Sequence, residues 1–200
     1  MATKGEKTRK NVIEQAMQLF SVKGYYHTSV NDLLAATGLT KGGLYCHFRS
    51  KEELWSAVYE DAVAVWRQIV FRGMRDVRDP VHRIEKTVEN VLINYLGEEV
   101  FVGGCFFVNM LVEMPGQSAE MNRRILRGFI GFSRLFQRWL READENGRLK
   151  PGLNFQEVAN FIVISLNGAA TFYTSSRDPV VLRQTLSQLR FYIHQLRSAD

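Results

Sequence analysis

Residues 28–54 read TSVNDLLAATGLTKGGLYCHFRSKEEL, and this stretch decides how the N-terminal part of the chain folds. Thr28 and Thr40 are each followed by a short run with helical spacing, and a threonine oxygen can accept hydrogen bonds from free N–H groups at a helix start. Gly38 permits a sharp turn between the two runs. The pattern predicts two short helices, about 29–37 and 41–47, held together by Leu33, Leu39 and Leu44. Such a pair is typical of a helix-turn-helix, and it also fits a helical hairpin within an ordinary core.

The positive charge of the chain lies in the same region. The chain has 200 residues and a formal net charge of +5. Residues 1–51 contain eight Lys and Arg against three Asp and Glu, so they hold the whole excess, and residues 52–200 balance to zero. This asymmetry predicts an N-terminal module that meets a polyanion, attached to a neutral body. The cations nearest the N-terminus would form a mobile arm beside that module: Lys4, Lys7, Arg9 and Lys10.

Helical patterns continue on both sides of this stretch. An apolar stripe over 9–23 ends at Gly24, and residues 182–196 place leucine and isoleucine at spacings of four and three. Later helices are expected to start at Ser50, Asp79-Pro80, Ser118, Asn154 and Asp178-Pro179. Because no run alternates with the period of a strand, the sequence predicts an all-α fold of about nine helices.

The quoted stretch resembles the signature of the TetR family of transcriptional regulators. The residues that carry the resemblance are Thr28-Ser29-Val30, Gly38, Thr40-Lys41-Gly42, Leu44-Tyr45, His47-Phe48 and Ser50-Lys51-Glu52. The match covers residues 8 to about 60, and the remainder is similar to the family only in its helical pattern and length. The resemblance implies a helix-turn-helix DNA-binding domain over 6–66, with a recognition helix at about 40–47. It also implies an effector-binding and dimerisation domain over 67–200.

The resemblance implies a set of DNA contacts: Thr28, Ser29, Thr40, Lys41, Gly42, Gly43, Tyr45, His47 and Lys51. Lys41 would donate to a guanine edge, and Tyr45 would meet a thymine methyl group or a phosphate. For Tyr45 and His47 the alternative is packing within the module, and for Lys51 it is a solvated side chain. Gly43 departs from the family pattern, which usually has threonine, serine or alanine there, so one base contact is expected to be absent. Leu34 replaces a small residue and would alter how closely the two helices approach.

A dimer is expected because one short recognition helix reads too few base pairs for specificity. The stripe on the last predicted helix would form the seam: Leu182, Leu186, Leu189, Ile193 and Leu196. Phe191 and Tyr192 lie outside this stripe as further apolar surface, and the preceding helix is apolar nearly all round. The alternative is that the stripe belongs to the core of a single subunit.

Bulky and adaptable side chains between residues 100 and 140 suggest an apolar effector pocket. The candidate lining residues, with Asn167 from a later helix, are Cys105, Phe106, Asn109, Met110, Met114, Phe132, Phe136 and Asn167. An aromatic and methionine stripe at helical spacing fits a plain core equally well. The arginine-rich face of the helix after Ser118 is interpreted as solvated surface, and the neutral body is expected to bind a neutral ligand.

Together these features predict a ligand-responsive DNA-binding regulator, a repressor that a small, largely apolar effector releases from a palindromic operator. The alternative is a helical carrier of a hydrophobic ligand that never binds DNA. The sequence has none of the usual catalytic motifs, so we expect neither an enzyme nor a metal or cofactor. It lacks a stretch long enough to span a membrane, and its two cysteines make no disulfide framework, so a cytoplasmic protein is expected.

Overall fold

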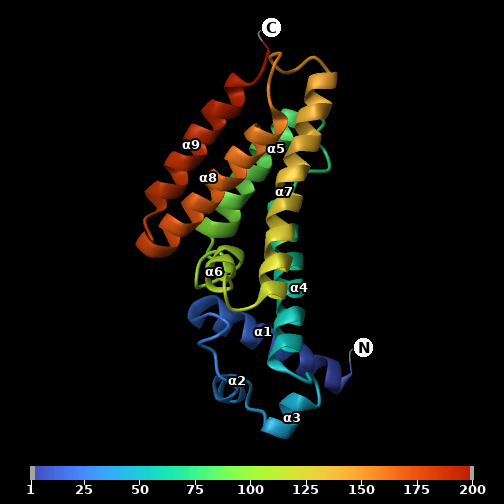
Figure 1. Cartoon of the computed structure of the whole chain (residues 1–200), viewed down its shortest axis with the longest axis vertical. Coiled ribbons are helices and arrows are strands. Elements are labelled where there is room, and N and C mark those ends of the chain that lie inside the picture. Colours follow the sequence, from blue (N-terminus) through green and yellow to red (C-terminus); the bar gives the residue numbers. More distant parts are fainter. Residues whose placement is uncertain (1–2, 199–200) are drawn as a thin grey trace.

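A computed structural model describes residues 3–198, and within them the chain forms nine α-helices and one π-helical segment (Figure 1). The N-terminal elements are α1 (Lys4–Lys23), α2 (Val30–Thr37), α3 (Lys41–Tyr45) and α4 (Lys51–Val70). They are followed by α5 (Pro80–Glu89), the π-helical segment η1 (Asn90–Gly97), α6 (Phe106–Glu113), α7 (Ala119–Glu145), α8 (Phe155–Ser176) and α9 (Pro179–Gln195). The predicted all-α fold is confirmed.

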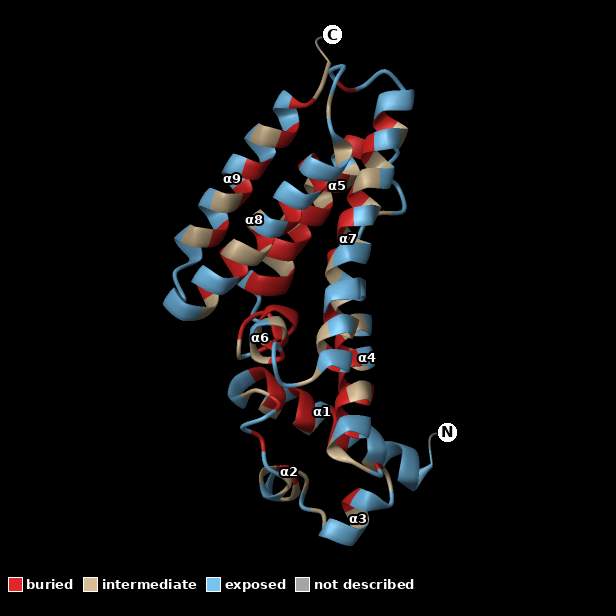
Figure 2. Cartoon of the chain, in the orientation of Figure 1, coloured by how far each residue is buried: buried red, intermediate tan, exposed pale blue. Residues whose placement is uncertain are grey.

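The molecule is elongated, with α1, α2 and α3 at one end and α5, α8 and α9 at the other (Figure 1). The long helices α4 and α7 connect the two ends, and α6 lies between α1 and the upper helices. The core is continuous through this arrangement, since buried side chains occur in every helix (Figure 2). A structural change at one end can therefore be transmitted to the other end through packed side chains.

Ser29, and not Thr28, begins the first helix of the predicted pair. The Ser29 hydroxyl accepts from the N–H of Asp32, and the Asp32 carboxylate accepts from the N–H of Ser29 in a reciprocal capping box. The expectation that Thr28 caps this helix is thus wrong. Thr28 is fully buried, and its hydroxyl donates to the carbonyl oxygen of Gly24 at 2.6 Å.

The turn and the second helix follow the predicted plan with a shorter helix. Gly38 adopts a left-handed conformation with φ of 68°, and Thr40 caps α3 by accepting from the N–H of Gly43. The helix ends at Tyr45, before the predicted residue 47. The proposed mobile arm is also corrected, because α1 begins at Lys4 and Thr3 caps it with Glu6.

Helix α4 passes without interruption from the N-terminal helices into the C-terminal part, across the predicted boundary between residues 66 and 67. Its upper end is held by Asn90 of η1, whose amide donates to the carbonyl oxygens of Val70 at 2.9 Å and Arg72 at 3.0 Å. Asn90 is 1% exposed, so this connection is inside the protein. It satisfies carbonyl groups that the end of a helix would otherwise leave without partners.

The leucine and isoleucine stripe of α9 is core within a single subunit. Its five predicted interface residues are all buried inside the protomer, where α9 packs on α8, α5 and η1: Leu182, Leu186, Leu189, Ile193 and Leu196. The assignment of these residues to a dimer seam is therefore wrong. Seam-like spacing marks the face of a helix that packs, and it does not say whether the neighbour belongs to the same chain.

Candidate nucleic-acid interface and ligand cavity

The helix-turn-helix presents a polar, cationic surface at one end of the molecule. Thr40, Lys41 and Gly42 are exposed at the start of α3, and Tyr45 is 41% exposed at its end. Ser29 is exposed at the start of α2. Free N–H groups at helix starts can hold phosphate oxygens, so the two helix starts and the exposed face of α3 suit a nucleic-acid backbone.

The remaining predicted DNA contacts are buried or partly buried. Thr28 is buried, so its hydroxyl has no surface for a phosphate. Lys51 is partly buried, and its ammonium group donates to the carbonyl oxygen of Tyr25 and lies 4.2 Å from the centre of the Tyr25 ring. Burial lowers the pKa of Lys51, against the opposing effect of Glu113 and Glu52. His47 is partly buried and Gly43 lies against Thr40.

Glu113 is a contact that the sequence did not reveal. Glu113 lies at the end of α6. Its carboxylate accepts hydrogen bonds from the backbone N–H of Tyr25 at 2.9 Å and from that of Tyr26 at 2.6 Å. Gly24 makes this approach possible, because a Cβ atom there would lie 2.8 Å from the carboxylate oxygens. The chain just before α2 is thereby tied to a helix of the C-terminal part.

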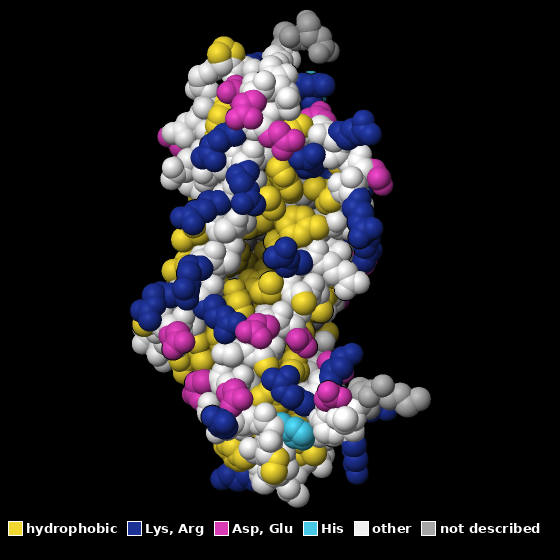
Figure 3. Space-filling model, turned by 90° about the vertical axis from the view of Figure 1, so that its right-hand side faces the viewer, with side chains coloured by type: hydrophobic (Ala, Val, Ile, Leu, Met, Phe, Trp, Pro, Cys, Tyr) yellow, Lys and Arg dark blue, Asp and Glu magenta, His cyan; other side chains and the backbone are white. Residues whose placement is uncertain are grey.

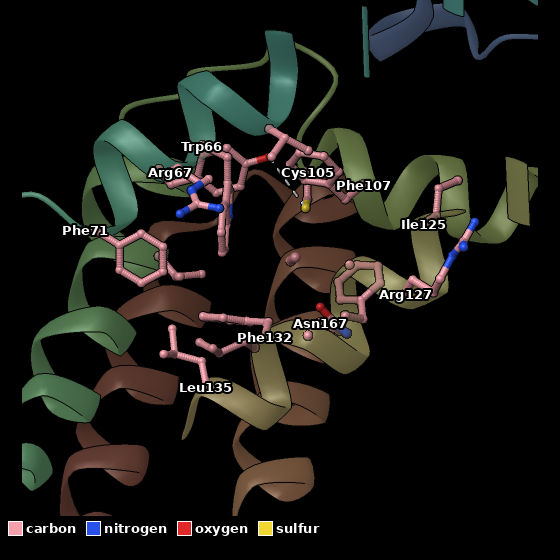
Figure 4. A pocket seen from close by; sticks show the side chains of 18 of the residues that line it. Trp66, Arg67, Phe71, Cys105, Phe107, Ile125, Arg127, Phe132, Leu135 and Asn167 are labelled. Carbon is pink, nitrogen blue, oxygen red and sulfur yellow. Dashed lines mark hydrogen bonds between the residues drawn. The ribbon is translucent and has the colours of Figure 1, made fainter. Parts of the chain in front are cut away.

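A second feature is a cavity of about 400 Å³ between α4, η1, α7 and α8. This volume lies in the range typical of small-molecule sites. Figure 4 shows Trp66 and Phe71 on one side, Phe132 and Leu135 on another, and Cys105, Phe107 and Asn167 around the remaining wall. The aromatic lining residues are Tyr59, Trp66, Phe71, Tyr95, Phe107, Phe129 and Phe132. The interior is thus suited to an apolar molecule.

The predicted pocket residues divide into two groups. Cys105, Phe132 and Asn167 line the cavity. The other five do not line it: Phe106, Asn109, Met110, Met114 and Phe136. Four of these are fully buried core, and Asn109 uses its amide to donate to the carbonyl oxygens of Gly103 and Ser21. The assignment of these five residues to the pocket is wrong for that reason.

Helix α4 supplies a wall that the sequence reasoning missed. Tyr59, Val63, Trp66 and Arg67 all line the cavity, and their spacing of four, three and one places them along one face of the helix. This spacing is visible in the sequence.

The inner wall of the cavity holds a neutral polar pair. The Tyr95 hydroxyl lies 3.6 Å from the sulfur of Cys105. Burial raises the pKa of the Cys105 thiol, although backbone N–H groups and the Tyr95 hydroxyl favour the thiolate. Burial likewise raises the pKa of Tyr95. Both groups are therefore uncharged near neutral pH.

An apolar surface covers the outer face of α8 and α9. Phe161 is 49%, Ile164 68%, Phe172 70% and Phe191 63% exposed. The ring centres of Phe161 and Tyr192 are 4.8 Å apart, so the two helices share this surface. We call Phe161, Ile164, Phe172, Phe191 and Tyr192 the outer apolar face.

Among residues 3–198, none of the His, Cys, Asp and Glu side chains form a group of three that could hold a metal ion. Over the same range, no helix combines the length and apolar character needed to cross a membrane.

Comparisons with known proteins agree with this geometry. Residues 12–58 match the family profile described as "Bacterial regulatory proteins, tetR family", and residues 80–189 match "Tetracyclin repressor-like, C-terminal domain". The chain is 27% identical over 180 residues to the "HTH-type transcriptional repressor DhaR" of Mycobacterium sp. (strain GP1), covering 90% of this chain and 88% of that protein. A crystal structure of a TetR transcriptional regulator from Chloroflexus aurantiacus J-10-FL is similar with a TM-score of 0.91 and 28% identity, covering 98% of this chain and 99% of that one.

Proposed function

Because the chain belongs to the TetR family of bacterial regulators, and is a ligand-responsive DNA-binding regulator and not an enzyme, we propose that it is a repressor acting as a homodimer on a palindromic operator in the cytoplasm. A small, largely apolar effector in the cavity would release it. The observation that carries the proposal is the joining of the exposed helix-turn-helix to the cavity wall by one helix, α4.

The exposed residues of α2 and α3 are the proposed DNA contacts. Lys41 and Tyr45 would meet base edges or adjacent phosphates, and Ser29 and Thr40 would help to hold phosphates at the helix starts. His47 and Gly43 stay in the proposed surface with smaller exposed areas. Lys51 would contribute mainly by holding Tyr25, although an ammonium group has donors to spare for a phosphate.

The outer apolar face supports the proposed dimer. Three phenylalanines and one isoleucine of this face are about half exposed or more. Monomeric soluble proteins rarely expose a large apolar patch of this kind. Because α8 and α9 share it, a second copy would bury it by forming a four-helix arrangement between subunits. Such a two-fold arrangement would place two copies of α3 on one side of the dimer, as a palindrome requires.

Release would act through α4. An effector between α4 and α7 contacts Tyr59, Val63 and Trp66, and a shift of these residues would tilt the helix that continues down to Lys51. Asn90 holds the upper end of α4, which favours a tilt about that end. The effector must bind the DNA-incompetent arrangement more tightly, because equal affinity for both arrangements shifts nothing.

Salt-dependent DNA binding tests the proposal. We expect the purified protein to bind the DNA that precedes its own coding sequence with an affinity that falls steeply as salt rises. Lys41→Ala should weaken binding, and should reduce the salt slope by about one if Lys41 meets a phosphate. The matched control is Lys150→Ala, an exposed lysine outside the helix-turn-helix, which should bind like the unaltered protein. Absence of binding to this fragment at low salt would contradict the proposal.

A further inference from the structure

The cavity is bordered by arginines and by no acidic side chain. Arg67, Arg127 and Arg138 are among its lining residues, and none of the 21 residues that line it is Asp or Glu. Figure 3 shows a hollow with hydrophobic side chains inside and Lys and Arg side chains along its border, on the side where α4 and α7 run. All three arginines are exposed, and Figure 4 shows the guanidinium of Arg67 beside Trp66 and that of Arg127 directed away from the other lining side chains.

Among residues 3–198 these three guanidinium groups have no ion pair, as is also true of Arg134 and Arg141 on α7, whereas some other arginines of the same body are paired. Arg83 pairs with Glu142, Arg124 with Glu60 and Arg177 with Glu99, at 2.8 to 3.1 Å. Among the carboxylates of residues 3–198, none lies within ion-pair distance of Arg67, Arg127 or Arg138. Arg127 donates only to the carbonyl oxygen of Arg123, at 3.3 Å. These three positive charges therefore have no direct ion-pair partner among the described residues.

The arginines are spread along the opening. Arg127 and Arg138 are eleven positions apart on α7, which corresponds to about 16 Å along a helix. Arg67 approaches from α4, and Figure 4 shows it beside Trp66 and Phe71. One small head group can therefore meet one or two of them. Gly128 and Gly131 line the cavity between the two α7 arginines and leave the mouth open there.

The interior of the cavity admits two opposite ligand classes. A ring of aromatic side chains can hold an organic cation through its π faces, as well as an apolar body. The three arginines oppose a cation, since each like charge at the mouth raises its energy. They favour an anion, because a guanidinium forms charge-assisted hydrogen bonds to a carboxylate. The neutral Tyr95 and Cys105 pair at the inner wall offers no competing charge.

We propose that the effector is an amphipathic organic anion, with an apolar body among the aromatic side chains and a carboxylate-like head at the arginine-bordered mouth. A cavity of about 400 Å³ lies within the range of small-molecule sites, so it has room for a chain of about ten carbons with a head group. This inference rests on the proposed function, since it assigns a chemical class to the effector of the same cavity. It also replaces the expectation of a neutral ligand.

Three probes with the same ten-carbon chain test the head group. Decanoate, decan-1-ol and decyltrimethylammonium are titrated by calorimetry into the full-length protein at neutral pH, below their micelle-forming concentrations and without DNA. Decanoate should bind about tenfold more tightly than decan-1-ol, which corresponds to one charge-assisted contact. Decyltrimethylammonium should bind more weakly than both. The advantage of decanoate should shrink as salt rises.

Substitutions locate the effect. Arg67→Gln should bring decanoate to within about twofold of decan-1-ol while leaving the binding of decan-1-ol unchanged. The matched control is Arg148→Gln, an exposed arginine beyond the end of α7 that does not line the cavity, which should keep the preference for decanoate. If Arg67→Gln has no effect, Arg127→Gln and Arg138→Gln are tested in the same way. No loss of the preference in any of the three would overturn the assignment of the head group to the mouth.

The remaining outcomes also decide the proposal. Equal or tighter binding of decan-1-ol or decyltrimethylammonium would overturn it, and so would the absence of binding by all three probes. None of these results depends on DNA. A failure of operator binding would instead contradict the proposed repressor function, and the preference for decanoate in calorimetry would stand without it.

Discussion

At the scale of single residues, hydrogen bonds with reciprocal geometry distinguish side chains that spacing alone treats as equivalent. Thr28 and Ser29 are adjacent hydroxyl residues before α2, and only Ser29 has an acidic residue three positions later to complete a capping box. That signal was present in the sequence and would have identified the cap. Glu113 offers no comparable signal, because its partners are backbone N–H groups 87 and 88 positions away.

Glu113→Gln tests the connection between α6 and the helix-turn-helix. The amide keeps one acceptor oxygen and loses the charge, so one of the N–H groups of Tyr25 and Tyr26 keeps a neutral acceptor and the other faces an NH2 donor. We expect the free energy of unfolding to fall by about 1–3 kcal/mol, measured by urea denaturation. The control Glu120→Gln changes an exposed side chain in the first turn of α7 and should stay within about 0.5 kcal/mol of the unaltered protein. Equal stability of the two variants would mean that Glu113 holds nothing in place.

At the scale of helices, the sequence predicted where the helices lie better than what each face contacts. Capping residues and proline at first turns located the starts of α4, α5, α7, α8 and α9 because those signals are local. The partner of an apolar face is not a local property. The stripe of α9 packs inside the subunit, whereas α8, apolar nearly all round, presents Phe161, Ile164 and Phe172 to the outside.

Phe172→Glu tests the outer apolar face as the dimer contact. Because Phe172 is 70% exposed in the single subunit, the substitution should leave the subunit folded and place a charge in the interface. We expect the mass measured by sedimentation to fall from that of a dimer to that of a monomer. The matched control Val112→Glu alters another residue, 73% exposed on α6, and should remain dimeric. A dimeric Phe172→Glu protein with an unchanged dissociation constant would place the interface elsewhere.

At the scale of the whole molecule, the cavity could not be predicted from any single segment. Its walls come from α4, η1, α7 and α8, from Cys105 before α6 and from Phe107 of α6, so its lining is decided by tertiary packing. The clustered aromatic residues gave the correct apolar character, but five of the eight expected side chains do not line the cavity, and four of these five fill the adjacent core. The sequence predicts a solvated surface for Arg127 and Arg138, and only the assembled helices bring Arg67 of α4 to the same cavity.

If the proposed function holds, α4 couples DNA binding to effector binding, and thermodynamic linkage makes that coupling reciprocal. If decanoate in the cavity weakens DNA binding by a given factor, operator DNA must weaken decanoate binding by the same factor. We expect a factor of about 5–150, measured by titrating DNA with and without saturating decanoate and decanoate with and without saturating DNA. A duplex of unrelated sequence at the same concentration controls for charge effects on the anion. Tight decanoate binding with no change in DNA affinity would mean that α4 does not transmit occupancy of the cavity, because a ligand with equal affinity for both arrangements leaves their populations unchanged.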